Sequence, residues 1–84
     1  MDLSKAVITG HAAAQMGKRS IEEAAVRAAL GQPDEVLGVR PGRVVAQRLA
    51  GGRLLRVFVD VDRDPPEVVT AYLTSKIDKY RSKP

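Results

Sequence analysis

The sequence predicts an α+β fold, with two N-terminal helices, a twisted antiparallel sheet of three to four strands and a short C-terminal helix. Three observations support this prediction. Alanines recur at helical spacing in the first third of the chain, apolar residues alternate on both sides of a Gly51-Gly52 pair, and a β-rich segment near the end precedes a polar helical stretch. With 84 residues the chain is expected to be one domain over residues 1–84, because a second core could not be filled.

Each N-terminal helix has a start signal of its own. The first helix is expected to begin at Thr9 or Gly10 and to continue through the alanines to Met16. The second is expected to follow at once, because Ser20 and Glu23 have the spacing of a capping box, in which each side chain accepts a hydrogen bond from the other residue's backbone amide. Apolar residues then recur at helical spacing until a glycine and a proline end the helix.

After Pro33 the apolar residues change from the period of a helix to that of a strand. The expected strands cover residues 36–39, 43–50, 53–62 and 68–73. A tight hairpin joins the second and third strands, because paired glycines accept the positive φ angles of a primed two-residue turn. Consecutive prolines exclude the stretch before the last strand from the sheet, and Thr74 or Ser75 can cap the short C-terminal helix.

A run of arginines without acidic neighbours is the main functional signal in the sequence. Between Val36 and Val59 the chain has no Asp or Glu and has five arginines, which are Arg40, Arg43, Arg48, Arg53 and Arg56. We expect the last four to form an RNA-binding surface on a sheet face that the helices leave open. The plainer interpretation is that half-exposed strands need polar residues and that arginine blunts exposed edges. The net charge of +4 suits nucleic acid and an acidic protein equally.

The composition favours a cytoplasmic protein that needs no cofactor. The chain has no cysteine, so nothing points to an oxidising compartment. Its first residues lack the apolar core of a signal peptide, and no apolar run approaches the ~20 residues that span a membrane. With one Phe, two Tyr and no Trp the core must be small, and a partner or a homodimer would stabilise it.

Titratable side chains offer little for metal binding. His11 is the only histidine, and without a carboxylate nearby in sequence it is expected to be structural, as is Arg19 after the first helix. Asp60, Asp62 and Asp64 lack the glycine and the terminal glutamate of a calcium loop, which indicates a solvated turn. We therefore expect no metal site.

The end of the chain has the residue types that metal-free RNA cleavage requires. Such a reaction needs a base for the 2′-hydroxyl group, a cation for the phosphorane and an acid for the leaving oxygen. The candidates, at the corner between the last strand and the last helix, are Thr70, Tyr72, Lys76 and Tyr80. Each of them taken singly has a plainer role, as an anchor of the helix or as part of its solvated face.

Nearly the whole chain also resembles a known group of proteins. The residues that carry the resemblance are His11-Ala12, Met16, Arg19, Ser20-Ile21-Glu22-Glu23, Pro33-Asp34, the glycine hairpin, and Val68-Val69-Thr70-Ala71-Tyr72 leading to Lys76 and Tyr80. Together they resemble a small bacterial family of unknown function that is related to the BrnT toxins and, more distantly, to RelE/ParE-type toxins. The resemblance implies the same α+β fold and a ribonuclease-like toxin that a cognate acidic antitoxin neutralises. RelE-like proteins cut ribosome-bound mRNA, whereas ParE-like proteins act on gyrase, so kinship of fold alone does not fix the target.

These inferences lead us to expect a toxin-like RNA-binding protein or a metal-independent endoribonuclease of a bacterial toxin-antitoxin module. The main alternative is a non-catalytic interaction module whose basic sheet binds an acidic protein segment, from an antitoxin or from gyrase. A third alternative is a solitary domain that has kept the fold and lost the toxicity.

Overall fold

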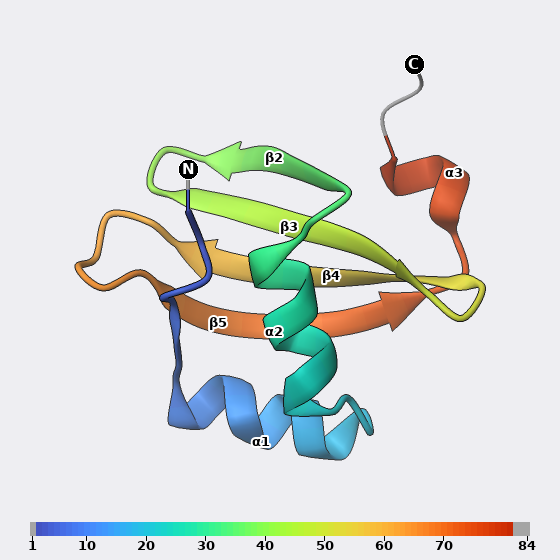
Figure 1. Ribbon diagram of the computed structural model, residues 1–84, viewed down its shortest axis with the longest axis horizontal. Coiled ribbons are helices and arrows are strands. Elements are labelled where there is room, and N and C mark those ends of the chain that lie inside the picture. Colours follow the sequence, from blue (N-terminus) through green and yellow to red (C-terminus); the bar gives the residue numbers. More distant parts are fainter. Residues whose placement is uncertain (1, 82–84) are drawn as a thin grey trace.

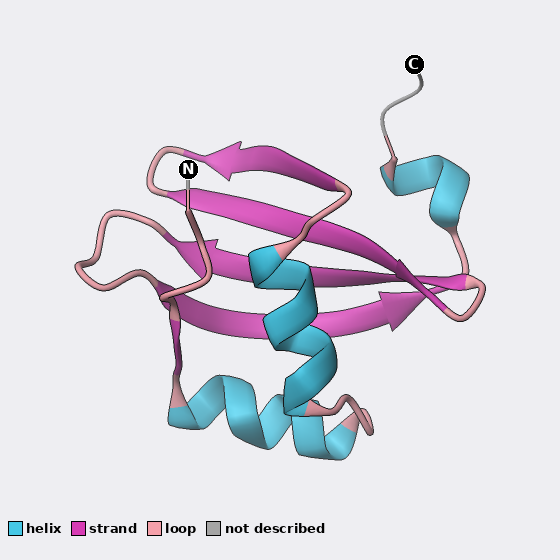
Figure 2. Ribbon diagram, in the orientation of Figure 1, coloured by secondary structure: helices cyan, strands magenta, loops and turns pink. Residues whose placement is uncertain are grey.

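The computed structural model describes residues 2–81. Figures 1 and 2 show its helices and strands, which are β1 (Val7–Ile8), α1 (Gly10–Lys18), α2 (Glu23–Gly31), β2 (Glu35–Arg40), β3 (Arg43–Ala50), β4 (Arg53–Asp60), β5 (Glu67–Thr74) and α3 (Ile77–Tyr80). The fold is α+β, as the sequence predicts. Within this described range, no helix combines the length and the apolar composition needed to cross a membrane.

The strands form one mixed sheet in the order β1-β5-β4-β3-β2, with β4 in the middle. Strands β2 to β5 pair antiparallel, and β1 adds a parallel fifth strand beside the start of β5. The predicted three- to four-stranded antiparallel sheet is therefore one strand short. Only two residues of β1 enter the sheet, and so short a stretch shows no apolar alternation.

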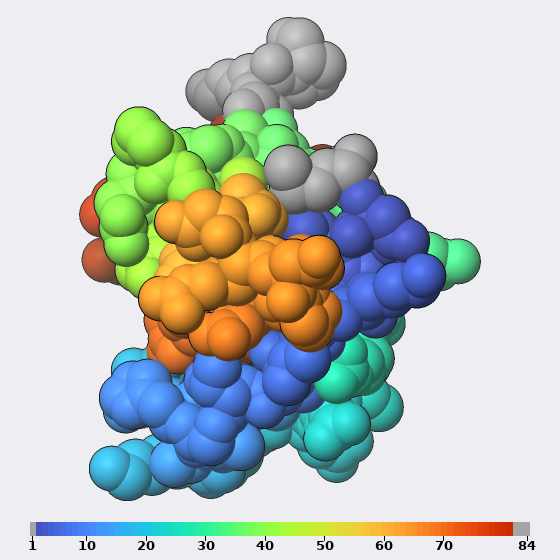
Figure 3. Space-filling model, turned by 90° about the vertical axis from the view of Figure 1, so that its left-hand side faces the viewer, coloured from blue at the N-terminus to red at the C-terminus, as the bar shows by residue number. Residues whose placement is uncertain are grey.

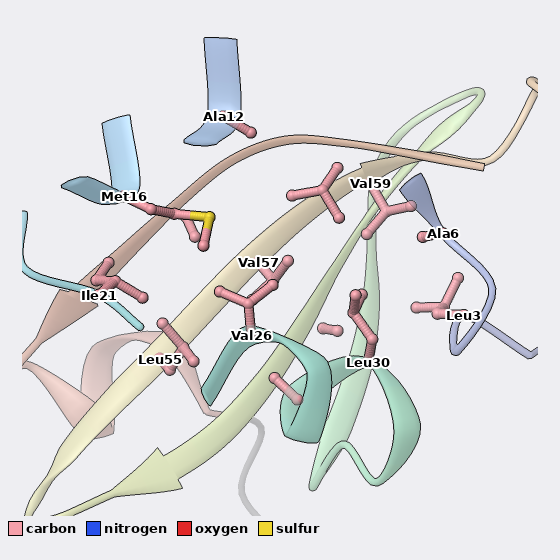
Figure 4. Packing of buried hydrophobic residues seen from close by; sticks show 14 residues of the cluster. Leu3, Ala6, Ala12, Met16, Ile21, Val26, Leu30, Leu55, Val57 and Val59 are labelled. Carbon is pink, nitrogen blue, oxygen red and sulfur yellow. The ribbon is translucent and has the colours of Figure 1, made fainter. Parts of the chain in front are cut away.

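Helices α1 and α2 cover one face of the sheet, and the hydrophobic core lies between them and that face (Figure 1). The buried members of the core are Leu3, Ala6, Ala12, Met16, Ile21, Val26, Ala29, Leu30, Ala46, Leu55, Val57, Val59, Val68 and Ala71. Figure 4 shows side chains from both helices and from β4 pointing into this common space. The small number of large side chains agrees with the alanine-rich and valine-rich composition.

A bulge at Val69 keeps the core continuous along β5. Phe58 pairs with Thr70, but its neighbour Val59 pairs with Val68, so β5 has one residue more than β4 at this point. The extra residue lets both Val68 and Ala71 face the core, although an uninterrupted strand would point them to opposite faces.

The start of α1 follows the prediction. Thr9 is its N-cap, and the Thr9 Oγ1 atom accepts a hydrogen bond of 3.1 Å from the amide of Ala12. This bond satisfies one of the amides that the first turn of a helix leaves without a partner. Helix α1 therefore begins at Gly10.

The capping box predicted at Ser20 is wrong. Helix α2 begins at Glu23, and Ser20 has a φ of 56° at the end of α1. The amide of Ile21 donates to the carbonyl of Met16 at 2.9 Å, and the amide of Ser20 donates to that of Gly17 at 3.3 Å. These two bonds form the Schellman motif that closes a helix. Ser20 therefore ends the first helix and leaves the start of the second uncapped by a side chain.

The hairpin predicted at the glycine pair is confirmed. Gly51 and Gly52 have φ angles of 58° and 82° and join β3 to β4 with Ala50 opposite Arg53. Two consecutive positive φ angles are those of a type I′ turn, whose twist matches that of the strands. The turn fixes the register of β3 against β4, and with it which side chains share a face.

Helix α3 lies on the other face of the sheet from α1 and α2. Figure 3 shows α2, in teal, and the end of the chain, in red, on opposite sides of the molecule. The side chain of Gln47, on β3, donates to the carbonyl of Tyr80 at 3.0 Å. The sheet face without α1 and α2 is therefore partly covered at the point where α3 rests on it.

Candidate functional site

The face of the sheet opposite α1 and α2, called the open face below, carries the candidate site. Its side chains from the three central strands include Arg43, Val45, Gln47, Leu54, Arg56, Phe58, Asp60, Thr70 and Tyr72. Arg56 lies on the middle strand, β4, directly between Gln47 of β3 and Tyr72 of β5. Strand register therefore places an arginine at the centre of this face.

Arg56 is surrounded by all the aromatic residues of the chain. Its guanidinium carbon lies 4.1 Å from the ring centre of Tyr80, 5.2 Å from that of Phe58 and 5.6 Å from that of Tyr72. The rings of Phe58 and Tyr72 stack with centres 5.9 Å apart, and those of Tyr72 and Tyr80 meet edge to face at 6.4 Å. These four residues are called the Arg56 cluster. Cation–π contacts stabilise such a cluster by about 0.5–1 kcal/mol each at exposed sites.

Hydrogen bonds fix the orientation of the Arg56 guanidinium. Its Nε donates to the Oε1 of Gln47 at 2.6 Å, and its Nη1 donates to the hydroxyl of Tyr72. Gln47 is fully buried, and its Nε2 donates in turn to the Oε1 of Glu35 and to the carbonyl of Tyr80, both at 3.0 Å. Gln47 thus connects β2, β3, β4 and α3 through one buried amide.

Tyr80 is more acidic than an ordinary tyrosine. A hydrogen bond with the Tyr72 hydroxyl lowers the pKa of Tyr80 below its ordinary value of 10.0. The positive charges of Lys79 and Arg56 lower the same pKa further, and the Nζ of Lys79 lies 5.3 Å from the ring centre. Because Arg56 donates to the Tyr72 oxygen, the Tyr72 proton is free to point at Tyr80. Arg56 thus donates to Tyr72 while its guanidinium lies over the ring of Tyr80, which places all three polar groups at one point of the open face.

Arg43, one of the four arginines predicted to bind RNA, is paired with an acid. Its Nε and Nη2 donate to the two carboxylate oxygens of Asp60 at 2.6 and 3.2 Å, across the ladder between β3 and β4. This pairing lowers the pKa of Asp60 and raises that of Arg43. The partner of Arg43 comes directly after Val59, where the acid-free stretch of the sequence ends.

Arg48 and Arg53 do not belong to the open face. Both alternate with Gln47 and Arg56 and point to the side of the sheet that α2 covers. Arg48 donates to the carbonyl of Gln32, the C-cap residue of α2. Arg53 is exposed and lines a pocket of about 260 Å³ together with residues of α2 and of the loop before it. The four arginines predicted to form one surface are therefore divided between the two faces.

The remaining predicted residues are spread around the Arg56 cluster. Thr70 is on the open face, but its hydroxyl accepts a 3.1 Å bond from Arg19, which also donates to the Ala71 carbonyl at 2.9 Å. Arg19 thus links the end of α1 to β5. Lys76 is exposed at the N-cap of α3, and His11 is exposed on α1 and makes no side-chain hydrogen bond within residues 2–81, so the structural link expected for it is not formed.

Three residues of the site escaped sequence reasoning. Gln47 orients Arg56, Glu35 accepts from Gln47, and Lys79 takes the place beside Tyr80 that was expected for Lys76. A polar Gln47 among the apolar residues of a central strand was a usable signal, since a buried amide needs partners on the same face. No comparable signal distinguishes Lys79 from Lys76, because a single turn of helix decides between them.

Comparison with known proteins identifies one family. The family described as a domain of unknown function (DUF4258) matches residues 8–73, which contain the second residue of β1, all of α1, α2 and β2 to β4, and nearly all of β5. No curated protein and no solved structure shows significant similarity to the chain. Three members of the Arg56 cluster lie within the matched range, and Tyr80 lies beyond it.

Proposed function

The chain belongs to the DUF4258 family, and from that premise we propose that it is a toxin-like protein of the bacterial cytoplasm that binds RNA and cleaves it without a metal ion. The observation that carries the proposal is the arrangement of Arg56, Tyr72 and Tyr80, in which Arg56 donates to the Tyr72 hydroxyl and lies 4.1 Å from the ring centre of Tyr80. The resemblance to BrnT and RelE-type toxins supports the same reaction class, whereas ParE-type proteins act on gyrase instead. It also supports ribosome-bound RNA as a substrate and a cognate acidic antitoxin as the natural partner.

The open face offers both kinds of contact that single-stranded RNA uses. Bases stack on aromatic rings with about 1–3 kcal/mol per base, and phosphates pair with cations. The partly exposed rings of Phe58, Tyr72 and Tyr80 are available for stacking. Arg56 and Lys79 supply positive charge next to those rings. The partly exposed face therefore suits a few nucleotides of single-stranded RNA.

The acid–base groups account for each proton of the proposed reaction. Tyr80, as the phenolate, removes the proton of a 2′-hydroxyl group, whose oxygen attacks the neighbouring phosphorus. The bond between phosphorus and the 5′ oxygen breaks, and Tyr72 donates a proton to that oxygen, which leaves a cyclic phosphate and a free 5′-hydroxyl group. A proton then returns from Tyr80 to Tyr72 along their hydrogen bond. Arg56 and Lys79 stabilise the added negative charge of the phosphorane.

Growth and RNA integrity test this proposal together. Expression of the chain without an antitoxin should slow bacterial growth, and Tyr80→Phe combined with Lys79→Ala should relieve the effect while the protein stays folded. The purified chain should cut RNA, free or on ribosomes, equally well with and without EDTA. Lys18→Ala is the matched control, because Lys18 is an exposed lysine on α1 and lies on the other side of the sheet.

Intact RNA in all these assays would refute the nuclease, as would full toxicity of the double variant. The alternative is then a non-catalytic module whose basic face binds an acidic protein segment. One observation favours that alternative. Arg56 already donates hydrogen bonds to two acceptors within the chain, so its guanidinium does not require a phosphate as a partner. Binding of an acidic peptide that Lys79→Ala weakens, without RNA cleavage, would identify this second function.

A further inference from the structure

We propose that two copies of the chain associate through β2, so that their sheets join into one continuous antiparallel sheet across a two-fold axis. Strand β2 is the last in the order β1-β5-β4-β3-β2 and pairs on one side only. Figure 1 shows no other described segment along its outer edge. Such an edge presents a row of free backbone donors and acceptors that another strand can pair with.

The opposite end of the sheet is protected against such pairing. There β1 covers only the start of β5, through two residue pairs. Beyond β1, Arg19 reaches over the edge of β5 and donates to the carbonyl of Ala71 and to the hydroxyl of Thr70. A very short edge strand and a charged side chain on the edge are two of the devices that prevent sheets from joining.

Strand β2 is a longer edge than β1 and exposes more large hydrophobic side chains. It is six residues long, and its sequence from Glu35 to Arg40 contains neither lysine nor proline. Within residues 2–81, the structure exposes four large hydrophobic side chains, and two of them belong to this strand, Val36 at 39% and Val39 at 46%. Pairing of β2 with another strand would remove apolar surface from water at the same place where it satisfies free backbone groups.

The charges of β2 identify a second copy of the chain as its partner. The strand has an acid at its first residue, Glu35, and a base at its last, Arg40. When two copies run antiparallel, the first residue of one lies beside the last residue of the other. The pair formed by Glu35 of one copy and Arg40 of the other then occurs twice in the dimer, as a two-fold interface requires.

The bulge in β2 makes this pairing geometrically consistent. Residues opposite each other in an antiparallel pair point to the same face, and residues five apart in a regular strand point to opposite faces. The bulge between Gly38 and Arg40 inserts one residue. Glu35 pairs with Gln47 and Arg40 with Arg43, so both point to the open face. A two-fold axis at Leu37 therefore brings Glu35 and Arg40 of the two copies together on one face.

Charge exchange tests the proposed interface. Sedimentation equilibrium of the full chain should show a dimer within the micromolar to millimolar range. Arg40→Glu should weaken it by roughly tenfold or more, because like charges then face each other twice. Glu35→Arg should do the same, and an equal mixture of the two variants should dimerise about as well as the unchanged chain. Circular dichroism confirms that each variant is folded.

A second pair of variants separates the edge from general surface effects. Val39→Lys should abolish the dimer, whereas Val7→Lys should leave it intact, because Val7 is equally exposed, at 47%, but lies on the opposite edge strand. The proposal fails if the chain stays monomeric up to millimolar concentration, or if the mixture of charge variants does not recover association. It also fails if both valine variants weaken the dimer alike, or if β2 pairs only with a strand of another protein.

Discussion

The Arg56 guanidinium packs against aromatic rings, and Gln47 and Tyr72 accept its hydrogen bonds. A lysine at the same position would carry the same charge but lack the planar fork that reaches both acceptors. The chemistry of the site therefore depends on geometry at one side chain. The neighbouring arginines have the same charge and do not have this environment.

Arg56→Lys should lower the free energy of unfolding by about 1–3 kcal/mol, because the buried Oε1 of Gln47 loses its donor. Arg53→Lys should change it by less than about 0.5 kcal/mol, because Arg53 is exposed. Urea unfolding followed by circular dichroism measures both. Equal stability of the two variants would show that the Arg56 cluster contributes nothing to folding.

The acidity of Tyr80 has a direct spectroscopic test. Its pKa is lowered in the folded state, so the stabilisation that comes with its ionisation is present above the unfolded pKa of about 10 and is lost as the pH falls through the folded value. Ultraviolet titration should show one tyrosine that ionises below pH 10.0. Tyr80→Phe should remove the early step. An early step that persists in Tyr80→Phe would assign the acidic group to Tyr72.

At the scale of elements, local signals predicted the sheet better than they predicted the helix boundaries. The Gly51-Gly52 turn was predictable because only one class of hairpin accepts two positive φ angles in succession. The four residues from Ser20 fit a capping box for α2. The same serine also comes just after α1, however, and in the structure it closes that helix instead. A motif of four residues does not show that the last carbonyl groups of the preceding helix also need hydrogen-bond donors from the same residues.

Ser20→Gly should raise the melting temperature. Ser20 has a φ of 56°, a left-handed conformation that costs a residue with a side chain roughly 1–2 kcal/mol and that glycine adopts freely. Part of the gain is lost to the greater entropy of glycine in the unfolded chain, which leaves up to about 1 kcal/mol. Calorimetry should therefore show an increase of a few degrees.

Ser75→Gly is the control for this substitution, because Ser75 is also an exposed serine but is not among the described residues with positive φ. It should lower the melting temperature slightly or leave it unchanged. If Ser20→Gly destabilises the protein as much as Ser75→Gly does, then the serine side chain contributes more to closing α1 than its backbone conformation costs.

The candidate site shows what pattern reasoning lacks. Side chains alternate between the two faces of β3 and β4, so Arg48 and Arg53 must lie on the opposite face from Arg56. This assignment was predictable from the sequence once the register of the hairpin was known. The contact between Arg56 and Tyr80 was not readable, because α3 and β4 lie far apart in sequence and the four-residue helix has no apolar stripe to orient it. Tertiary packing alone decides where such a helix rests.

At the scale of the whole molecule, the arginine charges are distributed over both faces of the sheet and do not form one basic surface. Arg43 is paired with Asp60, Arg48 is bound to the end of α2, and Arg53 faces the α2 side. Next to the Arg56 cluster, Lys79 is exposed and its Nζ lies 5.3 Å from the ring centre of Tyr80. The net charge of +4 therefore overstates the positive field that any single ligand meets.

RNA affinity should accordingly depend only moderately on salt. Two cations at the open face, Arg56 and Lys79, give a slope of log K against log salt of about −1.4, at roughly −0.7 for each phosphate contact with single strands. Lys79→Ala should flatten the slope by about 0.7. Arg48→Ala should leave the slope unchanged, although it removes a hydrogen bond to α2. A flatter slope in Arg48→Ala would place RNA on the helix-covered face instead.

The buried amide of Gln47 has a single permitted orientation. Arg56 can only donate to it, whereas the Glu35 carboxylate and the Tyr80 carbonyl can only accept from it, so the amide cannot rotate without breaking all three bonds. Glu35 lies on the edge strand and Tyr80 over the cluster. A ligand on the open face and a strand docked on β2 therefore act on the same amide, and any effect that one has on the affinity of the other is reciprocal by the same factor.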